Sequence, residues 1–229
     1  MALVTGPLPS QSAGMPQPRQ LACLRRLAIA CAVLSPLAAR AAEAQAPATR
    51  APWGLFSARY DTHTSDFIYA LYGYGRSFAM VGTLQNPRSG WTELVGAVGR
   101  TFAFGDGPSH SIATGVAHAS DGWYGQLYYV PTVPVGPAWV RATAEWDVPL
   151  GNRGATQFAL SPLSFTVPAV RSVEAGISMD LAAASSSRTS VALGPELRAA
   201  IPGAVIGTDL QRATRGGTSR LRLFFLTQF

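Results

Sequence analysis

Alternation of apolar and polar residues with a period of two dominates the sequence after residue 47, and this alternation predicts β-strands. The clearest example runs from Ala138 to Leu150, where every even-numbered position is apolar. Arg141, Glu145 and Asp147 lie at odd-numbered positions of the same segment. Because successive side chains of a strand point to opposite faces, this segment has one apolar and one charged face.

Two further segments follow the same pattern. Val173 to Leu181 alternates apolar residues with a second set that includes Glu174 and Asp180. The last ten residues place Leu221, Leu223, Phe225, Thr227 and Phe229 on one face, and Arg220, Arg222, Phe224, Leu226 and Gln228 on the other.

Turn-forming clusters rich in Gly, Pro, Asn and Ser separate the remaining strand candidates. About twelve strands are expected in all, within a range of eight to twelve. The other candidates are Trp53–Tyr60, Phe67–Tyr74, Ser77–Leu84, Trp91–Phe104, Ser111–His118, Trp123–Val133, Thr156–Thr166, Ser190–Ala199 and Ala204–Gln211. Strands of about ten residues joined by short turns are typical of membrane barrels.

Alternation alone fits a soluble sandwich, whose polar face meets water, as well as a membrane barrel, whose polar face lines the interior. The composition favours the barrel, because only 13% of the residues are charged against roughly 25% in ordinary soluble domains. Aromatic residues also gather near strand ends, as they do at the two surfaces of a bilayer: Trp53, Tyr60, Tyr72, Tyr74, Trp91, Trp123, Tyr124, Trp139 and Trp146. We therefore predict an all-β fold, a closed antiparallel transmembrane β-barrel formed by residues 47–229 as a single domain.

Residues 1–46 read as a leader with a cleaved signal peptide, and Met15 is a possible true start. The apolar segment Leu27–Ala39 is too short to cross a bilayer as a helix, which takes about 20 residues. It is followed by Ala44-Gln45-Ala46, a cleavage site of the A-x-A type. Three arginines precede it: Arg19, Arg25 and Arg26.

The final strand resembles the C-terminal strand of bacterial outer-membrane β-barrel proteins. That strand ends in an aromatic residue, usually Phe, after apolar residues at alternating positions, and Phe229, Phe225, Leu223 and Leu221 match it. Thr227 departs from the pattern, since a bulkier residue is usual there. The resemblance implies a bacterial outer-membrane location. It also implies that these four residues act as the signal recognised by the assembly machinery, with outer-membrane lipid as the surrounding partner.

Charge and motifs exclude several classes of function. All 18 basic residues are arginine, and 14 of them, with 11 acidic residues, follow residue 46. So small an excess, without an arginine-rich run, does not indicate nucleic-acid binding. Both cysteines, Cys23 and Cys31, lie in the leader, and no metal-ligand spacing or phosphate-binding glycine loop occurs. No metal or other cofactor is expected.

The leading function predicted from these patterns is a narrow porin-like channel for small hydrophilic solutes. Its expected lining is the charged set on the inward faces: Arg141, Glu145, Asp147, Glu174, Asp180, Arg220 and Arg222. The arginines either attract anions, as charged pore linings do, or pair with the four carboxylates and fill the barrel. The sequence leaves both open, and a monomer is the default assembly.

Three other functions remain as alternatives. The first is a closed structural or adhesion barrel that displays short loops such as Asp61–Asp66 and Ala182–Thr189. The second is a lipid-modifying outer-membrane hydrolase, because His118 and Ser120 lie two apart and resemble the His-x-Ser pair of lipid A deacylases. No glutamate follows this pair at close spacing, and Ser120-Asp121-Gly122 also reads as a simple turn. The third is a soluble periplasmic β-protein.

Overall fold

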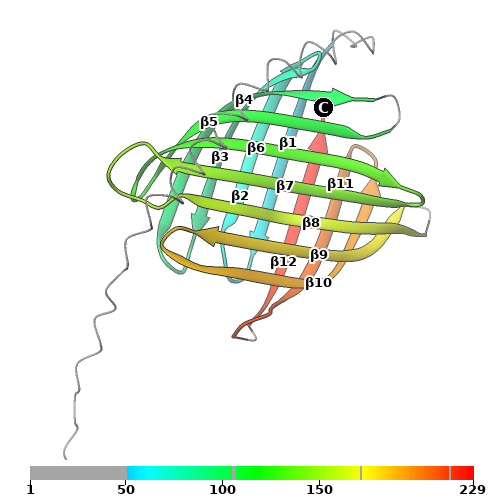
Figure 1. The fold of residues 1–229 in the computed structure, drawn as a ribbon. Helices are drawn as coiled ribbons and strands as arrows, with labels where there is room; N and C mark the ends of the chain where they lie inside the picture. Colours follow the sequence, from blue (N-terminus) through cyan, green and yellow to red (C-terminus); the bar gives the residue numbers. More distant parts are fainter. Residues whose placement is uncertain (1–50, 105–106, 171, 217) are drawn as a thin grey trace, which may run out of the picture.

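The computed structural model describes residues 51–104, 107–170, 172–216 and 218–229, which form one closed barrel of twelve antiparallel strands (Figure 1). The expected fold class and strand number are confirmed. The expected leader, residues 1–46, lies outside the described residues. The strands are β1 Pro52–Asp61, β2 Asp66–Tyr74, β3 Ser77–Asn86, β4 Trp91–Ala103, β5 Ser109–Ala119, β6 Gly122–Val135, β7 Ala138–Pro149, β8 Gln157–Val170, β9 Val173–Ala184, β10 Ser187–Ile201, β11 Ala204–Ala213 and β12 Ser219–Gln228.

Each strand pairs with its sequence neighbours, and β1 pairs with β12 to close the ring. The end of the barrel where Gly54 lies beside Phe229 is called the terminal end, and the opposite end is called the loop end. Connections at the terminal end are two to five positions long, and those at the loop end are two to seven. Both loops that the sequence singled out, around 61–66 and 182–189, belong to the loop end.

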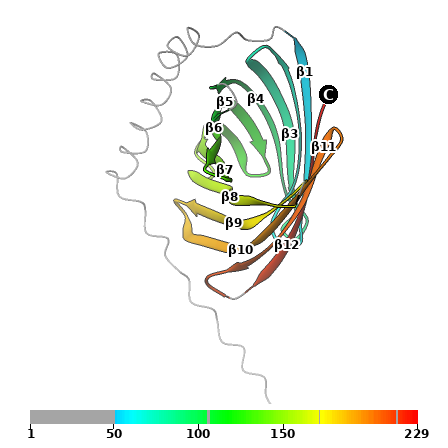
Figure 2. The ribbon, with the colours of Figure 1, turned by 90° about the vertical axis from the view of Figure 1, so that its right-hand side faces the viewer.

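The barrel is flattened into two facing walls. Strands β7 to β9 cross in front of β1 and β12 in Figure 1, and the quarter turn of Figure 2 shows β8 and β9 on the side opposite β1 and β12. Side chains that point inward from these two walls therefore face one another across the interior, which is called the lumen below.

The outer face is apolar, as the alternation predicts. Val81, Leu94, Val98, Val116 and Ile177 are among its exposed residues, each at least 48% exposed. Because water-facing sheets carry polar outer faces, this surface is typical of strands that face lipid.

The aromatic girdles are only partly as expected. Among the described residues, Tyr60 and Trp123 are exposed on the outer face near the loop end, and Tyr72 and Tyr74 near the terminal end. Trp146 also faces outward, packed on Phe158. Trp53, Trp91, Tyr124 and Trp139 instead point into the lumen.

Trp53, Trp91 and Tyr124 belong to an apolar cluster inside the barrel, on the inner faces of β1 to β6. Its buried members are Phe78, Val95, Ala97, Ala113, Ala117, Ala119, Tyr124 and Tyr128, with Trp53, Leu71, Met80, Leu84 and Trp91 packed against them. The lumen therefore has one apolar side and one polar side. Strands β2 and β3 carry mostly apolar residues on both faces, a pattern typical of strands buried on both sides.

Close packing of neighbouring strands predicts the effect of a substitution at Gly194. A Cβ atom there would lie 1.8 Å from the carbonyl oxygen of Leu210 on β11, so Gly194→Ala has to displace backbone. We expect a loss of about 1–3 kcal/mol in the free energy of unfolding, measured by urea titration of the folded barrel in detergent. Gly96→Ala is the matched control, because nothing lies within 4 Å of its added Cβ. Equal stability of the two variants would contradict this packing.

Candidate functional site

Polar side chains occupy the inner faces of β7 to β12, and they extend to β1, β4 and β6. They form three groups, which are named here the arginine network, the terminal-end ion pairs and the acid cluster. Their positions follow from the alternation of each strand, because the same period that exposes apolar residues outward turns these residues inward.

The arginine network lies toward the loop end and joins β12 to β9 and β11. Arg222 is 1% exposed and donates from Nε to both carboxylate oxygens of Asp209 at 2.9 Å and from Nη1 to Asp180 Oδ2 at 2.6 Å. Arg220 donates to the same Asp180 oxygen at 2.6 Å and approaches Asp61 Oδ2 at 3.8 Å. Four further residues complete the network: Arg59, Ser161, Ser178 and Gln211.

The terminal-end ion pairs lie near the other mouth of the barrel. Arg141 on β7 donates to both oxygens of Glu174 on β9, at 2.7 and 3.0 Å. Thr166, on the strand between them, donates to the same Glu174 carboxylate at 2.7 Å. Glu196 and Arg198 form a second pair on β10. Bidentate pairing of this kind fixes both partners in one geometry.

The acid cluster consists of Glu93, Glu145 and Asp147, which converge on the side-chain amide of Gln126. The amide nitrogen lies 2.7 Å from Glu93 Oε1, 3.0 Å from Glu145 Oε1 and 3.0 Å from Asp147 Oδ1. The Tyr128 hydroxyl donates to the amide oxygen at 2.8 Å. An amide nitrogen has two hydrogens, so three carboxylates share two donors. In the described part of the chain, no arginine forms an ion pair with these three carboxylates.

Small residues on the intervening strands allow these contacts between strands that are not neighbours. Ala117 and Ala119 on β5 leave room for the amide of β6 to reach the β4 carboxylate of the acid cluster. Gly194 on β10 similarly lies between Gln211 of β11 and Ser178 of β9, whose side chains are 2.8 Å apart. Small residues on an intervening strand therefore let polar side chains of the two flanking strands come into contact.

All seven residues expected to line the lumen point inward, but they divide among the three groups. Arg141 pairs with Glu174, and Arg220 and Arg222 both pair with Asp180, in line with the pairing alternative. Glu145 and Asp147 meet no arginine at ion-pair distance and join the acid cluster instead. Whether any of the seven contacts a solute stays a prediction.

Sequence reasoning missed several residues of these groups, among them Glu93, Asp209 and Arg59. Each is a charged residue within a predicted strand. In a barrel with an apolar outer face, a charged residue within a strand is itself a signal of an inward position.

The residues of the proposed hydrolase pair do not contact each other. The ring of His118 packs on Trp123 on the outer face, with centroids 4.6 Å apart. Ser120 lies in the β5–β6 turn, where its hydroxyl donates to the carbonyl oxygen of Thr92 and accepts from the Thr92 amide at 2.9 Å. Among the described residues, no group of three or more His, Cys, Asp or Glu is arranged to hold a metal ion.

The proposed assembly residues face outward. Leu221, Leu223, Phe225 and Phe229 are all exposed on the outer face of β12. Phe225 packs beside Phe56 of β1, with ring centroids 6.5 Å apart. This arrangement leaves the four side chains in one accessible row, and their role in assembly stays a prediction.

The burial of Arg222 predicts a large cost when its charge is removed. Arg222→Ala leaves Asp209 without its buried partner, so we expect a loss of about 3–5 kcal/mol in the free energy of unfolding. Urea titration in detergent, followed by the heat-modifiable mobility of the barrel on gels, measures the loss. Arg88→Ala, at an exposed turn, is the control and should stay within about 0.5 kcal/mol. A similar small change for both variants would show that the arginine network does not stabilise the barrel.

Comparisons with known proteins identify the fold. No protein family model matches the sequence, and no curated protein is significantly similar to it. None of the described segments is a helix long and apolar enough to cross a membrane. The structure of the KdgM porin in complex with disordered oligogalacturonate matches with a TM-score of 0.56 and 8% identity, over 77% of this chain and 99% of that chain. The NanC porin matches with a TM-score of 0.54 and 9% identity, over 76% and 98%. The chain therefore has a porin-like fold of the outer-membrane β-barrel class, as in the small porins KdgM and NanC.

Proposed function

We propose that this protein is a narrow porin-like channel of the bacterial outer membrane that passes small hydrophilic solutes. The observation that carries the proposal is the row of charged and polar side chains on the inner faces of β7 to β12, enclosed by a barrel whose outer face is apolar. Eight strands leave an interior filled by side chains, and sixteen or more leave a wide aqueous channel. Twelve strands lie between these limits and suit a small pore.

The two ends of the barrel support an orientation in the membrane. Outer-membrane barrels have short periplasmic turns and longer extracellular loops. The longest connection here, seven positions between β7 and β8, lies at the loop end. We assign the loop end to the cell exterior and the terminal end, where Phe229 lies, to the periplasm.

The first test of the channel is planar-bilayer conductance of the purified mature barrel refolded in detergent. Heat-modifiable mobility on gels establishes folding beforehand. We expect small, discrete conductance steps, because the polar side of the lumen offers a hydrated route beside the ion pairs. Silence from a demonstrably folded sample would overturn the channel and leave a closed barrel whose polar groups only fill the interior.

The charge of the lumen points to the class of solute. The three polar groups contain five arginines and eight acidic residues: Arg59, Arg141, Arg198, Arg220 and Arg222 against Asp61, Glu93, Glu145, Asp147, Glu174, Asp180, Glu196 and Asp209. Rings of acidic side chains favour cations in channels. We therefore assign this channel neutral or cationic solutes, in contrast to the oligogalacturonate, a polyanion, named in the KdgM complex.

Ion selectivity tests this assignment. We expect the channel to pass potassium more readily than chloride. The sign of the reversal potential in a KCl gradient measures this preference. The triple variant Glu93→Gln, Glu145→Gln and Asp147→Asn should move the reversal potential toward zero, because it removes the carboxylates that lack an arginine. Arg88→Gln is the control, since it removes one charge at an exposed turn, outside the three polar groups. Chloride selectivity of the natural chain, or an unchanged triple variant, would contradict the assignment.

A further inference from the structure

Several hydrogen bonds cross the lumen between strands that are not neighbours in the ring, and two of them reach Ser161 of β8. Arg59 of β1 donates from Nη1 to Ser161 Oγ of β8 at 3.2 Å. Arg222 of β12 donates from Nη1 to the same hydroxyl at 3.3 Å. The ring order places β2 and β12 beside β1, and β7 and β9 beside β8. Figures 1 and 2 show β1 and β8 on opposite walls, so these side chains bridge the lumen at this level.

The two arginines that reach Ser161 are held very differently. Arg222 is fixed by the carboxylates of Asp209 and Asp180. Arg59 has only the neutral hydroxyl of Ser161 as a hydrogen-bond acceptor in the described part of the chain, and its Nε is buried without a partner. Its guanidinium also lies 5.8 Å from the centre of the Phe67 ring. A buried charge with so few partners is unfavourable, whereas carboxylate pairing holds the other arginines of the three groups.

Arg59 also lies among charges of both signs. Arg222 and Arg220 repel it, while Asp180, Asp61 and Glu145 attract it. Among the described residues, none of these carboxylates lies within ion-pair distance of its guanidinium. Its position is therefore held by one hydrogen bond, by packing and by these more distant charges.

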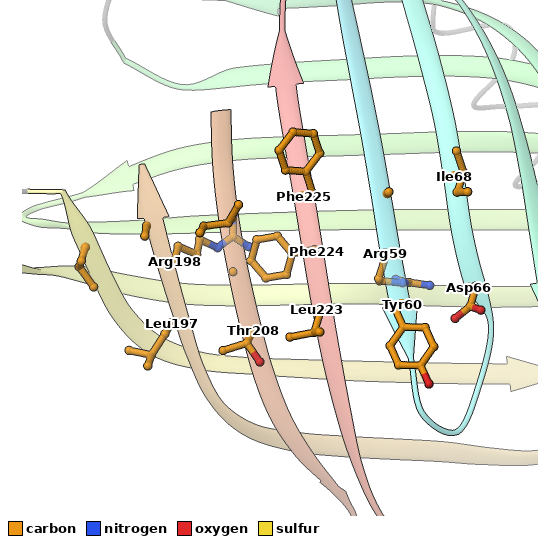
Figure 3. Close-up of a pocket in the computed structure, with 15 residues that line it drawn as sticks. Arg59, Tyr60, Asp66, Ile68, Leu197, Arg198, Thr208, Leu223, Phe224 and Phe225 are labelled. Atoms are coloured by element: carbon orange, nitrogen blue, oxygen red, sulfur yellow. The ribbon is translucent and has the colours of Figure 1, made fainter. Parts of the chain in front are cut away.

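The close-up in Figure 3 shows the residues around Arg59 in the barrel wall. Arg59 lies at a hollow of the wall formed by β10, β11, β12, β1 and β2, among Tyr60, Phe224 and Phe225. Phe224 and Arg198 occupy the neighbouring positions, with the Arg198 guanidinium 5.0 Å from the centre of the Phe224 ring. Asp66 of β2 also lines this hollow. In the described part of the chain, however, no carboxylate lies within ion-pair distance of Arg59.

We propose that Arg59 is the residue that restricts the channel and sets its ion selectivity. Its side chain stands across the lumen, anchored on Ser161, and adds the only positive charge of the three polar groups that no carboxylate pairs with. Arg59 limits both the width of the solute route through the lumen and its preference for cations. This inference rests on the proposed channel function.

The test compares single-channel conductance and reversal potential for the natural chain, Arg59→Ala, Ser161→Ala and the control Arg88→Ala, each shown to be folded by heat-modifiable gel mobility. We expect Arg59→Ala to raise the unitary conductance roughly twofold or more and to shift the reversal potential further toward potassium, because a bulky cation leaves the lumen. Ser161→Ala should raise conductance with a smaller shift in reversal potential, since it frees Arg59 without removing its charge. Arg88→Ala should leave both quantities unchanged.

The outcomes separate this inference from the channel function. If the natural chain conducts and Arg59→Ala has the same conductance and reversal potential, the role of Arg59 is refuted and the channel stands. If the natural chain is silent and Arg59→Ala conducts, Arg59 is the side chain that closes the lumen, and the natural barrel is not an open channel. Silence of both folded proteins overturns both proposals.

Discussion

Pairing of β1 with β12 joins the first and last strands of the sheet, and the other features of the barrel depend on this closure. In lipid, each backbone N–H and C=O group needs a partner within the protein, because no water reaches the hydrocarbon region. An open sheet would leave two rows of unpaired groups, whereas the antiparallel register from Leu55 and Gln228 to Asp61 and Arg222 satisfies them. The same closure encloses the charged side chains, which would otherwise face lipid.

Enclosure makes the inward charges depend on one another. Arg222, Asp209 and Asp180 are buried within a structure whose outer face is apolar, so each charge needs a partner that the fold brings from another strand. The small residues on the intervening strands, such as Gly194, make those contacts possible. Packing and electrostatics are thus coupled, because the same glycine that allows close strands also lets polar groups meet across them.

The lumen is not uniformly polar, and this asymmetry shapes the proposed function. Aromatic and aliphatic residues such as Phe78 and Val95 pack on the inner faces of β1 to β6, where the acid cluster adjoins them, while the ion pairs occupy the inner faces of β7 to β12. The proposed hydrated route follows the polar groups. Most arginines of the three polar groups form ion pairs. The electrostatic field in the lumen therefore comes mainly from the carboxylates without arginine partners and from Arg59.

The sequence by itself determined the fold class, the strand number and the faces of the charged strands, because a period of two assigns each side chain to one face whatever its distant neighbours are. It could not determine which inward charges meet. Arg220 and Asp180 are 40 positions apart, and their contact depends on the register and curvature of four strands. Nor did alternation show that Trp53 and Trp91 lie inside, because aromatic residues near strand ends suit an outer girdle as well as an inner apolar cluster. Only the closed tertiary structure decided these points, because it alone fixes which faces oppose each other across the lumen.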